Sequence, residues 1–157
     1  MMTLNLVFVG KTALPSIDIA IERYLGRLGH YIPTRVYQVR AERILHKSIE
    51  ETVRERESGR ILDLVGKEDY LVVWDQRGRE FDSVGLAGFL ERLRAEGAAK
   101  VWMVTGGPLG VSPKLLEAAN SVLALSRMTF PHDIARLVLA EQLYRAFTIL
   151  RNEPYHK

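Results

Sequence analysis

Short apolar runs alternate with amphipathic stretches along the chain. Five runs are typical of buried β-strands, because each is short, rich in β-branched, leucine or aromatic residues, and bounded by turn residues. They span residues 4–10, 33–39, 70–74, 100–105 and 122–125. The stretches between and after them carry apolar residues at the three-to-four spacing of a helix face. The pattern therefore predicts strands and helices in alternation.

Serine and proline residues mark where several helices should begin. A serine at the N-cap accepts a hydrogen bond from the first free N–H groups of a helix. The predicted caps are Ser16, Ser48, Ser83 and Ser112, and Pro131 opens a last helix that runs to about Arg151. The segment 75–81, DQRGREF, is expected to form a turn.

Repeated strand–helix alternation favours an α/β fold with a parallel-type sheet flanked by helices. The 157 residues contain no internal repeat and no low-complexity linker, so we expect a single domain over residues 1–157. Ligands of such sheets bind beyond the carboxyl ends of the strands. The loops that follow the strands are therefore the expected binding site.

The segment after Pro131 is apolar on nearly every side of its helix axis. One face of a sheet would cover only part of such a helix. This pattern indicates a self-association surface. The alternative is a central helix buried within a single chain.

Composition narrows the class of protein. Hydrophobic residues make up 47% of the chain and charged residues 26%, as in ordinary globular proteins. The absence of cysteine excludes disulfides and thiolate metal sites, and no metal site is expected. Without a secretory-type N-terminus or an apolar run of membrane-spanning length, a cytoplasmic location is the expectation. A net charge of +3 favours contact with polyanions but does not establish nucleic-acid binding.

Three loops follow predicted strands at the expected binding edge. The glycines of TGGPLG (105–110) would let backbone N–H groups approach a ligand, although a tight turn explains them equally well. This loop lacks the Lys-Ser/Thr of a P-loop and the spacing of a dinucleotide fingerprint, which disfavours an ATPase or a dehydrogenase. DQRG (75–78) and LSRMTF (125–130) would supply two further walls. Their mixture of apolar side chains and backbone groups suits a flat heterocycle better than a phosphate.

Five polar residues near the C-terminal end are candidate catalytic residues. They are His132, Arg136, Arg145, Tyr155 and His156. A charge on an apolar helix must be paired or face a ligand. Together the five would form a positive rim beside the third loop, suited to phosphate and base contacts. For Arg145, an ion pair with Glu141 one turn earlier is the simpler alternative.

Several motifs together resemble a known family. LVFVGK, GGPLG, SRMTFPH and the C-terminal EQLYRAFTILRNEPYHK are similar to the ribosomal large-subunit RNA methyltransferases that modify N3 of a pseudouridine, minimal members of the SPOUT superfamily. The similarity covers essentially the whole chain. It implies a SPOUT fold with a trefoil knot in the C-terminal half, an obligate homodimer with sites near the interface, and a substrate in the 23S rRNA of the assembled ribosome.

The resemblance also implies the cofactor S-adenosylmethionine, bound in a bent form by the three loops. Carried onto this chain, the implied contacts are Trp74, Gly106, Leu125, Ser126, Arg127, Met128, Thr129 and Phe130. Family members commonly have leucine at the position of Trp74, which favours a contact through its backbone.

Methyl transfer from a sulfonium needs no covalent nucleophile, so positioning is the main work of such an enzyme. His132 or His156 is the candidate base for the imide proton of pseudouridine N3. Arg136 or Arg145 would stabilise negative charge on the adjoining carbonyl oxygens. Two other functions stay open: a non-catalytic ribosome-binding or assembly protein on the same fold, and a tRNA-directed enzyme of the superfamily.

Overall fold

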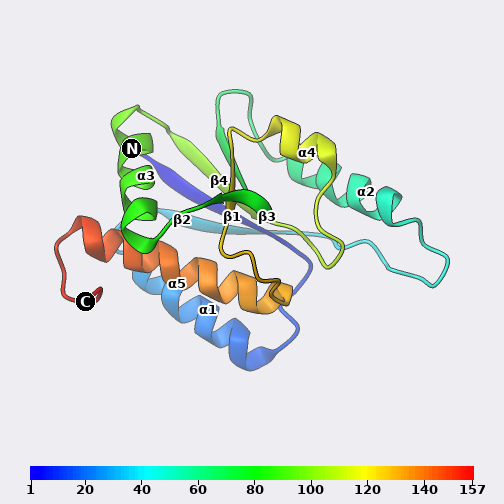
Figure 1. Ribbon diagram of the computed structural model, residues 1–157, viewed down its shortest axis with the longest axis horizontal. Coiled ribbons are helices and arrows are strands. Elements are labelled where there is room, and N and C mark those ends of the chain that lie inside the picture. The colour runs from blue at the N-terminus through cyan, green and yellow to red at the C-terminus, as the bar shows by residue number, and fades with distance from the viewer.

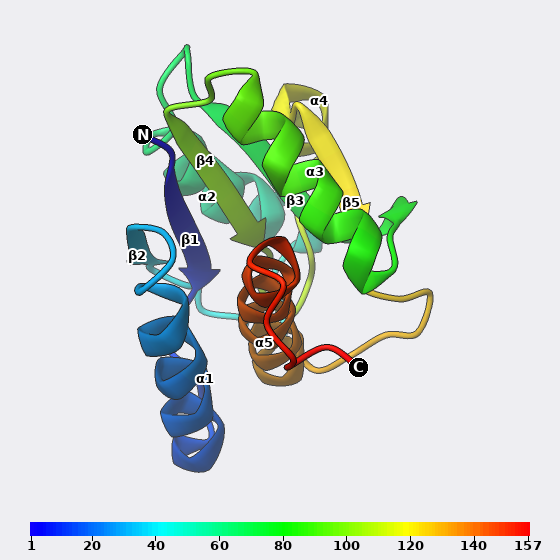
Figure 2. The same cartoon turned by 90° about the vertical axis from the view of Figure 1, so that its left-hand side faces the viewer.

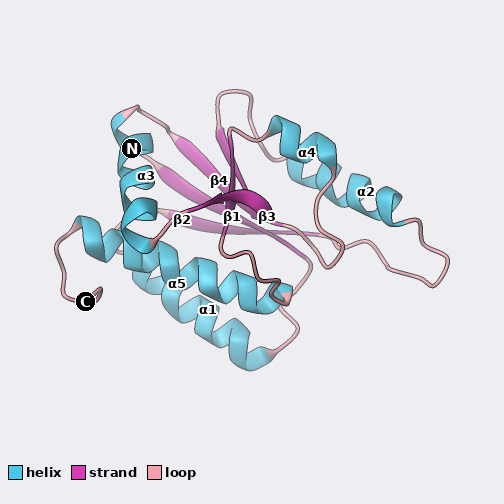
Figure 3. Cartoon of the chain, viewed as in Figure 1, coloured by secondary structure: helices cyan, strands magenta, loops and turns pink.

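The computed structural model describes the whole chain, residues 1–157, and contains five strands alternating with five helices (Figures 1 and 3). The elements are β1 (Thr3–Val9), α1 (Pro15–Leu28), β2 (Thr34–Val39), α2 (Glu50–Leu62), β3 (Tyr70–Glu80), α3 (Ser83–Ala95), β4 (Lys100–Thr105), α4 (Pro113–Ala118), β5 (Ser121–Ala124) and α5 (His132–Leu150). All strands are parallel, in the order β2-β1-β4-β3-β5. The predicted α/β class with a parallel sheet flanked by helices is confirmed.

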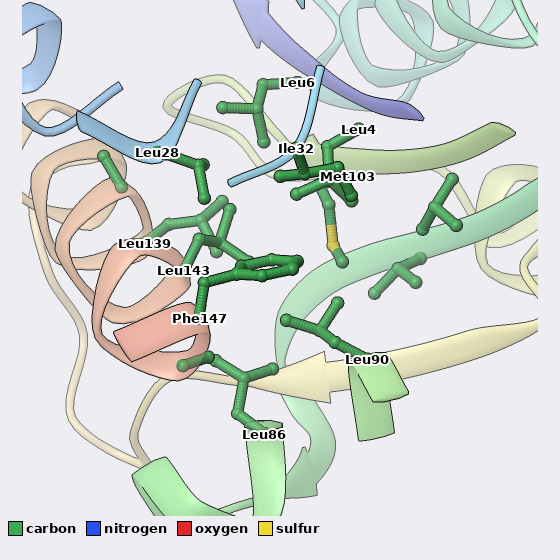
Figure 4. Packing of buried hydrophobic residues seen from close by; sticks show 14 of the residues in the cluster. Leu4, Leu6, Leu28, Ile32, Leu86, Leu90, Met103, Leu139, Leu143 and Phe147 are labelled. Carbon is green, nitrogen blue, oxygen red and sulfur yellow. The ribbon is translucent and has the colours of Figure 1, made fainter. Parts of the chain in front are cut away.

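Both faces of the sheet are covered by helices. On β1, Leu4 and Leu6 belong to the larger core cluster with α1, α3 and α5, whereas Val7 and Val9 belong to a second cluster with α2 and α4. Figure 2 shows the two helix layers on opposite sides of the sheet, and Figure 4 shows Leu4 and Leu6 facing Leu143 of α5. Burial on both faces explains why the strands are nearly continuous in apolar residues.

Helix α5 packs between α1 and α3, over the sheet (Figure 2). Residues such as Leu139 and Leu143 are fully buried, and the remaining positions, Leu137 and Tyr144 among them, are half-buried. One chain therefore covers most of this helix by itself. The central-helix alternative thus accounts for much of the apolar pattern, and self-association through the half-buried positions stays a prediction. The homodimer, which the resemblance also implies, remains a prediction.

Only one of the four predicted serine caps is confirmed. The Ser112 Oγ accepts a hydrogen bond from the Leu115 N–H at 3.2 Å. The N-caps of α1, α2 and α3 are Leu14, Ile49 and Asp82 in place of Ser16, Ser48 and Ser83. For α1 the reason is long-range, because the Asp133 carboxylate accepts from the Leu14 N–H at 3.0 Å across the fold. Spacing along the sequence does not reveal such an acceptor.

The predicted turn at 75–81 is also wrong, because β3 continues to Glu80. Trp74 and Arg79 both pair with Leu123 of β5, and the residues between them bulge out of the ladder. The strand crosses β5 closely there: a Cβ added at Gly78 would lie 2.6 Å from backbone atoms of Val122. The DQRG residues therefore project as a bulge, and the pairing resumes beyond them.

Candidate functional site

A cavity of about 710 Å³ lies at the carboxyl ends of β3, β4 and β5. All three loops predicted from the sequence line it: residues 74–77, 105–112 and most of 125–131. The start of α5 and one side of α2 complete the walls. Its volume lies in the range of small-molecule and cofactor sites. The predicted meeting of three loops at one sheet edge is therefore confirmed.

The Gly-rich loop is both a tight turn and a cavity wall. Gly107 and Gly110 form an isolated bridge, and Gly110 has a φ of +81°, a conformation that favours glycine. A Cβ on Gly106 would lie 2.9 Å from Val111 Cγ1. The two sequence interpretations of this loop are thus compatible, because the close turn is what brings its backbone to the cavity.

Two side chains at the ends of β3 and β4 line the cavity next to the Gly-rich loop. Thr105 is 5% exposed, lines the cavity, and its hydroxyl has no hydrogen-bond partner within the protein. A buried hydroxyl without a partner is costly, so a ligand atom there would be favourable. The indole N–H of Trp74 donates to the Met103 sulfur at 3.3 Å, which turns that end of the ring toward the core. Sequence reasoning identified Trp74 but missed Thr105, because only the three-dimensional structure shows that the Thr105 hydroxyl has no hydrogen-bond partner.

The third loop is tied to the β3 bulge. Ser126 Oγ accepts from the Met128 N–H at 2.9 Å, and the Thr129 hydroxyl donates to Gln76 Oε1 at 3.1 Å. Five members of the predicted set in this loop line the cavity: Leu125, Ser126, Met128, Thr129 and Phe130. Arg127 does not, because its side chain is 93% exposed and pairs with Glu80 at 3.2 Å. The Arg127 side chain is therefore outside the cavity lining, and its implied contact with the cofactor stays a prediction.

The first turn of α5 separates two residues that the sequence placed together. His132 lines the cavity, and its Nε2 lies 3.3 Å from Asp133 Oδ1. Arg136 is fully buried and donates to the Val9 carbonyl and, at 3.1 Å, to Thr12 Oγ1. Its guanidinium also stacks 4.9 Å from the centroid of the Phe8 ring. Arg136 thus fastens α5 to the end of β1, and its prediction as a catalytic rim residue is corrected.

The ionisation of this structural pair follows from its surroundings. Burial lowers the pKa of Arg136, and the neighbouring Asp133 carboxylate opposes that shift. Burial alone would raise the pKa of Asp133, but backbone N–H donors from Leu14 and Ala13 bring it below its ordinary value. The Asp133 carboxylate accepts from backbone N–H groups of Ala13 and Leu14, and the Arg136 guanidinium donates to Val9 and Thr12 while its buried Nε has no partner.

The remaining candidates lie at the other end of α5. Arg145 pairs with Glu141 at 2.6 Å, as the simpler alternative predicted, and contacts His156 Nδ1 at 3.3 Å. The Tyr155 hydroxyl donates to the same Glu141 at 3.0 Å, and burial with these contacts raises the pKa of Tyr155. Arg145 lies thirteen positions after His132 on the helix, roughly 20 Å along the axis. Within one chain, this C-terminal cluster therefore does not face the cavity, which corrects the predicted single rim.

The fourth wall of the cavity was missed altogether by sequence reasoning. Glu51, Arg54 and Glu55 of α2 line it, opposite in character to the backbone-rich loops. They lie in a long charged stretch, where a solvated helix face is the ordinary interpretation. Only the packing of α2 beside the Gly-rich loop shows that this part of the stretch borders a cavity.

Helix α2 also contacts the Gly-rich loop and the residues that follow it. The Ser112 N–H donates to Ser58 Oγ at 3.0 Å. Glu57 is 2% exposed, accepts from the Glu42 N–H at 2.9 Å, and its Oε1 has no partner. A Cβ on Gly107 would lie 3.0 Å from that oxygen. Burial raises the pKa of Glu57.

We expect Glu57→Gln to remove part of the pH dependence of stability. Folded Glu57 holds its proton more tightly than the unfolded chain, so the free energy of unfolding should fall as pH rises from the ordinary value of 4.5 through the folded pKa. The amide of the variant carries no titrating proton and should flatten that decline. Urea unfolding measured across this range tests it, with Glu117→Gln at an exposed carboxylate of α4 as the control. An unchanged profile in Glu57→Gln would contradict the raised pKa.

The cavity fits the cofactor that the resemblance implies. Its loops offer backbone groups and the apolar side chains of Leu125, Met128 and Phe130, which suit an adenine ring. The Thr105 hydroxyl offers one unused hydrogen bond.

The described residues contain no group of three or more His, Cys, Asp or Glu side chains placed to hold a metal ion. No helix is both long and apolar enough to span a membrane.

Comparison with known proteins gives matches over the whole chain. A family model described as "Predicted SPOUT methyltransferase" matches residues 2–156. A protein of Syntrophobacter fumaroxidans named "Ribosomal RNA large subunit methyltransferase H" is 57% identical over 157 residues, covering 99% of this chain and 100% of that protein. Proteins of the same name from Halothermothrix orenii and Porphyromonas gingivalis are 40% and 39% identical, over at least 99% of both chains in each comparison.

Proposed function

The chain belongs to the SPOUT methyltransferase family, and from this premise we propose that it transfers a methyl group from S-adenosylmethionine to 23S rRNA of the large ribosomal subunit. The proposed target is N3 of a pseudouridine, the 1915 site, in the assembled ribosome. The observation that carries the proposal is the cavity at the carboxyl ends of β3, β4 and β5, with seven of the eight implied contact residues in its lining. Only Arg127 stands outside.

The bound cofactor supplies an electrophilic methyl group on a sulfonium. Holding the target nitrogen in line with that methyl group is the main contribution of the loops. His132 lines the same cavity and accepts the imide proton, with Asp133 beside its Nε2 to orient the ring. No other histidine lines the cavity.

We further propose that the enzyme works as a homodimer in which the C-terminal cluster of one chain faces the cavity of the other. One chain holds Arg145, Tyr155 and His156 far from its own cavity. Glu141 binds Arg145 and Tyr155, Arg145 contacts His156, and all three side chains are at least partly exposed to solvent. A second copy would restore the positive rim that the sequence predicts. The trefoil knot implied by the resemblance remains a prediction.

Ribosomes from a strain lacking this gene test the main proposal. The purified protein with S-adenosylmethionine should methylate one pseudouridine in intact ribosomes, as read by mass spectrometry of 23S rRNA nucleosides. Methylation of tRNA in place of rRNA would favour the tRNA-directed alternative. Cofactor binding without any transfer would favour an assembly protein, and absence of both would overturn the proposal.

Mixed dimers test the shared site. Gly106→Val should block the cavity, and the double variant Tyr155→Ala, His156→Ala should remove the cluster, so each homodimer should be inactive. If cavity and cluster come from different chains, a heterodimer of the two variants regains one complete site and roughly half of the activity. An inactive heterodimer, or a protein that sediments at the 17.8 kDa of one chain, would contradict the shared site.

We expect Thr105→Val to weaken cofactor binding without loss of stability. The hydroxyl makes no bond within the protein, so only a bond to the ligand is lost, worth about 1 kcal/mol or roughly fivefold in affinity. Calorimetry with S-adenosylhomocysteine and thermal unfolding measure the two effects. Thr52→Val, on α2 and outside the cavity lining, is the control. Equal affinity of Thr105→Val and the wild type would exclude Thr105 from the site.

A further inference from the structure

The α2 side of the cavity differs in chemistry from the other walls. The two charged side chains of the loops, Asp75 and Arg77, pair with each other, and the rest of those walls consists of backbone groups, uncharged side chains and one histidine. Helix α2, in contrast, presents three charged side chains in the order Glu51, Arg54, Glu55. These positions are three and four residues apart, so they share one face of the helix. Ser58, one turn further on that face, binds the Ser112 N–H and so directs the face toward the Gly-rich loop.

The Arg54 guanidinium makes only weak hydrogen bonds within the chain, so it can bind a stronger acceptor. Its Nη1 lies 3.5 Å from the Leu109 carbonyl and 3.5 Å from Glu50 Oε2, both at the outer limit of a hydrogen bond. The other arginine of the lining, Arg77, is engaged by Asp75 through two contacts of 2.7 and 3.0 Å. That bond also lowers the pKa of Asp75. Arg54 is therefore the cation of the cavity that can receive an anionic group.

We propose that this charged wall binds the amino-acid end of the cofactor, with Arg54 on its carboxylate and Glu51 and Glu55 on its ammonium group. The inference rests on the proposed function, since it assigns the methionine part of the cofactor within the same cavity. An amino acid carries opposite charges on one carbon and is matched by opposite charges side by side on one helix face. An arginine–carboxylate contact is among the stronger hydrogen-bonded pairs.

The same wall is poorly suited to RNA. A phosphate that reached Arg54 would also meet the negative charges of Glu51 and Glu55, which repel it. A zwitterion avoids this penalty because each of its charges has its own partner. The α2 wall therefore favours a small zwitterion over a polyanion.

Calorimetry with two adenosine ligands separates the amino-acid end from the rest. S-Adenosylhomocysteine carries the amino-acid end, and 5′-methylthioadenosine lacks it. Two variants are compared: Arg54→Gln, and the double variant Glu51→Gln, Glu55→Gln. Each should lower the affinity for S-adenosylhomocysteine by about tenfold, the value of one charge-assisted hydrogen bond. Both should leave the affinity for 5′-methylthioadenosine within about twofold of wild type. Arg56→Gln is the matched control, because Arg56 pairs with Glu42 at 3.0 Å and does not line the cavity.

The outcomes distinguish this inference from the proposed function. Unchanged S-adenosylhomocysteine affinity in both variants, or an equal loss for both ligands, overturns the α2 assignment alone. So does an Arg54→Gln variant with normal cofactor affinity but a raised KM for ribosomes, which would make the wall an RNA contact. A wild-type protein that binds neither ligand overturns the proposed function itself.

Discussion

Gly78→Ala should destabilise the protein by about 3 kcal/mol, at the upper end of the usual cost of overpacking. The added Cβ would lie 2.6 Å from the backbone carbon and oxygen of Val122. Backbone atoms of a paired strand cannot rotate aside as a side chain can. The bulge of β3 or strand β5 must move, and both carry walls of the cavity. Chemical unfolding should show the loss, and calorimetry should show weaker cofactor binding by the folded variant.

Gly88→Ala provides the matched control for this prediction. Gly88 is exposed within α3, and nothing lies within 4 Å of a Cβ added there. The same chemical change should therefore stabilise the protein by roughly 0.5–1 kcal/mol, because alanine favours the helix. If Gly78→Ala unfolded at the same denaturant concentration as Gly88→Ala, then β3 would not cross β5 as closely as the structure indicates.

Arg136→Met should cost about 3 kcal/mol of stability, because one partner of a buried charged network is removed. The Val9 carbonyl and Thr12 hydroxyl would lose their donor, and Asp133 would remain buried without its neighbouring cation. Methyl transfer per folded molecule should be close to that of the wild type, since Arg136 does not line the cavity. Unfolding curves and kcat measured well below the melting temperature test both statements.

Two further variants make the Arg136 result decisive. Arg136→Lys keeps the charge and should recover part of the stability even if Arg136→Met does not fold. Arg127→Met removes an exposed ion pair with Glu80 and should change stability by less than about 0.5 kcal/mol. A folded Arg136 variant with a roughly hundredfold lower kcat and wild-type stability would restore the catalytic role predicted from the sequence.

The three loops of the cavity were predictable because each directly follows a strand. Parallel strands place their carboxyl ends at one sheet edge, so Trp74, Gly106 and Leu125 had to lie near one another once the strands were identified. The grouping of His132 with Arg145 and His156 had no such support. It assumed that residues close to one loop in the sequence face it in space, and α5 carries Arg145 about 20 Å away.

Several features had no signal in the sequence. The isolation of the Thr105 hydroxyl depends on its neighbours in β1 and β3, and the role of Arg54 depends on where α2 packs. The start of α1 depends on Asp133, which lies 120 residues beyond Ala13 along the chain. Each is decided by a partner from another element, which local spacing cannot reveal.

Hydrophobic periodicity and chain direction were enough to predict the strand–helix alternation, the parallel sheet and the three loops at its edge, because each can be read along the chain. Three-dimensional packing was needed to show that β3 crosses β5 at Gly78, that Arg136 is a structural residue, and that a charged helix face closes the cavity. These outcomes depend on close packing between distant segments, where a displacement of about one ångström separates a contact from a clash.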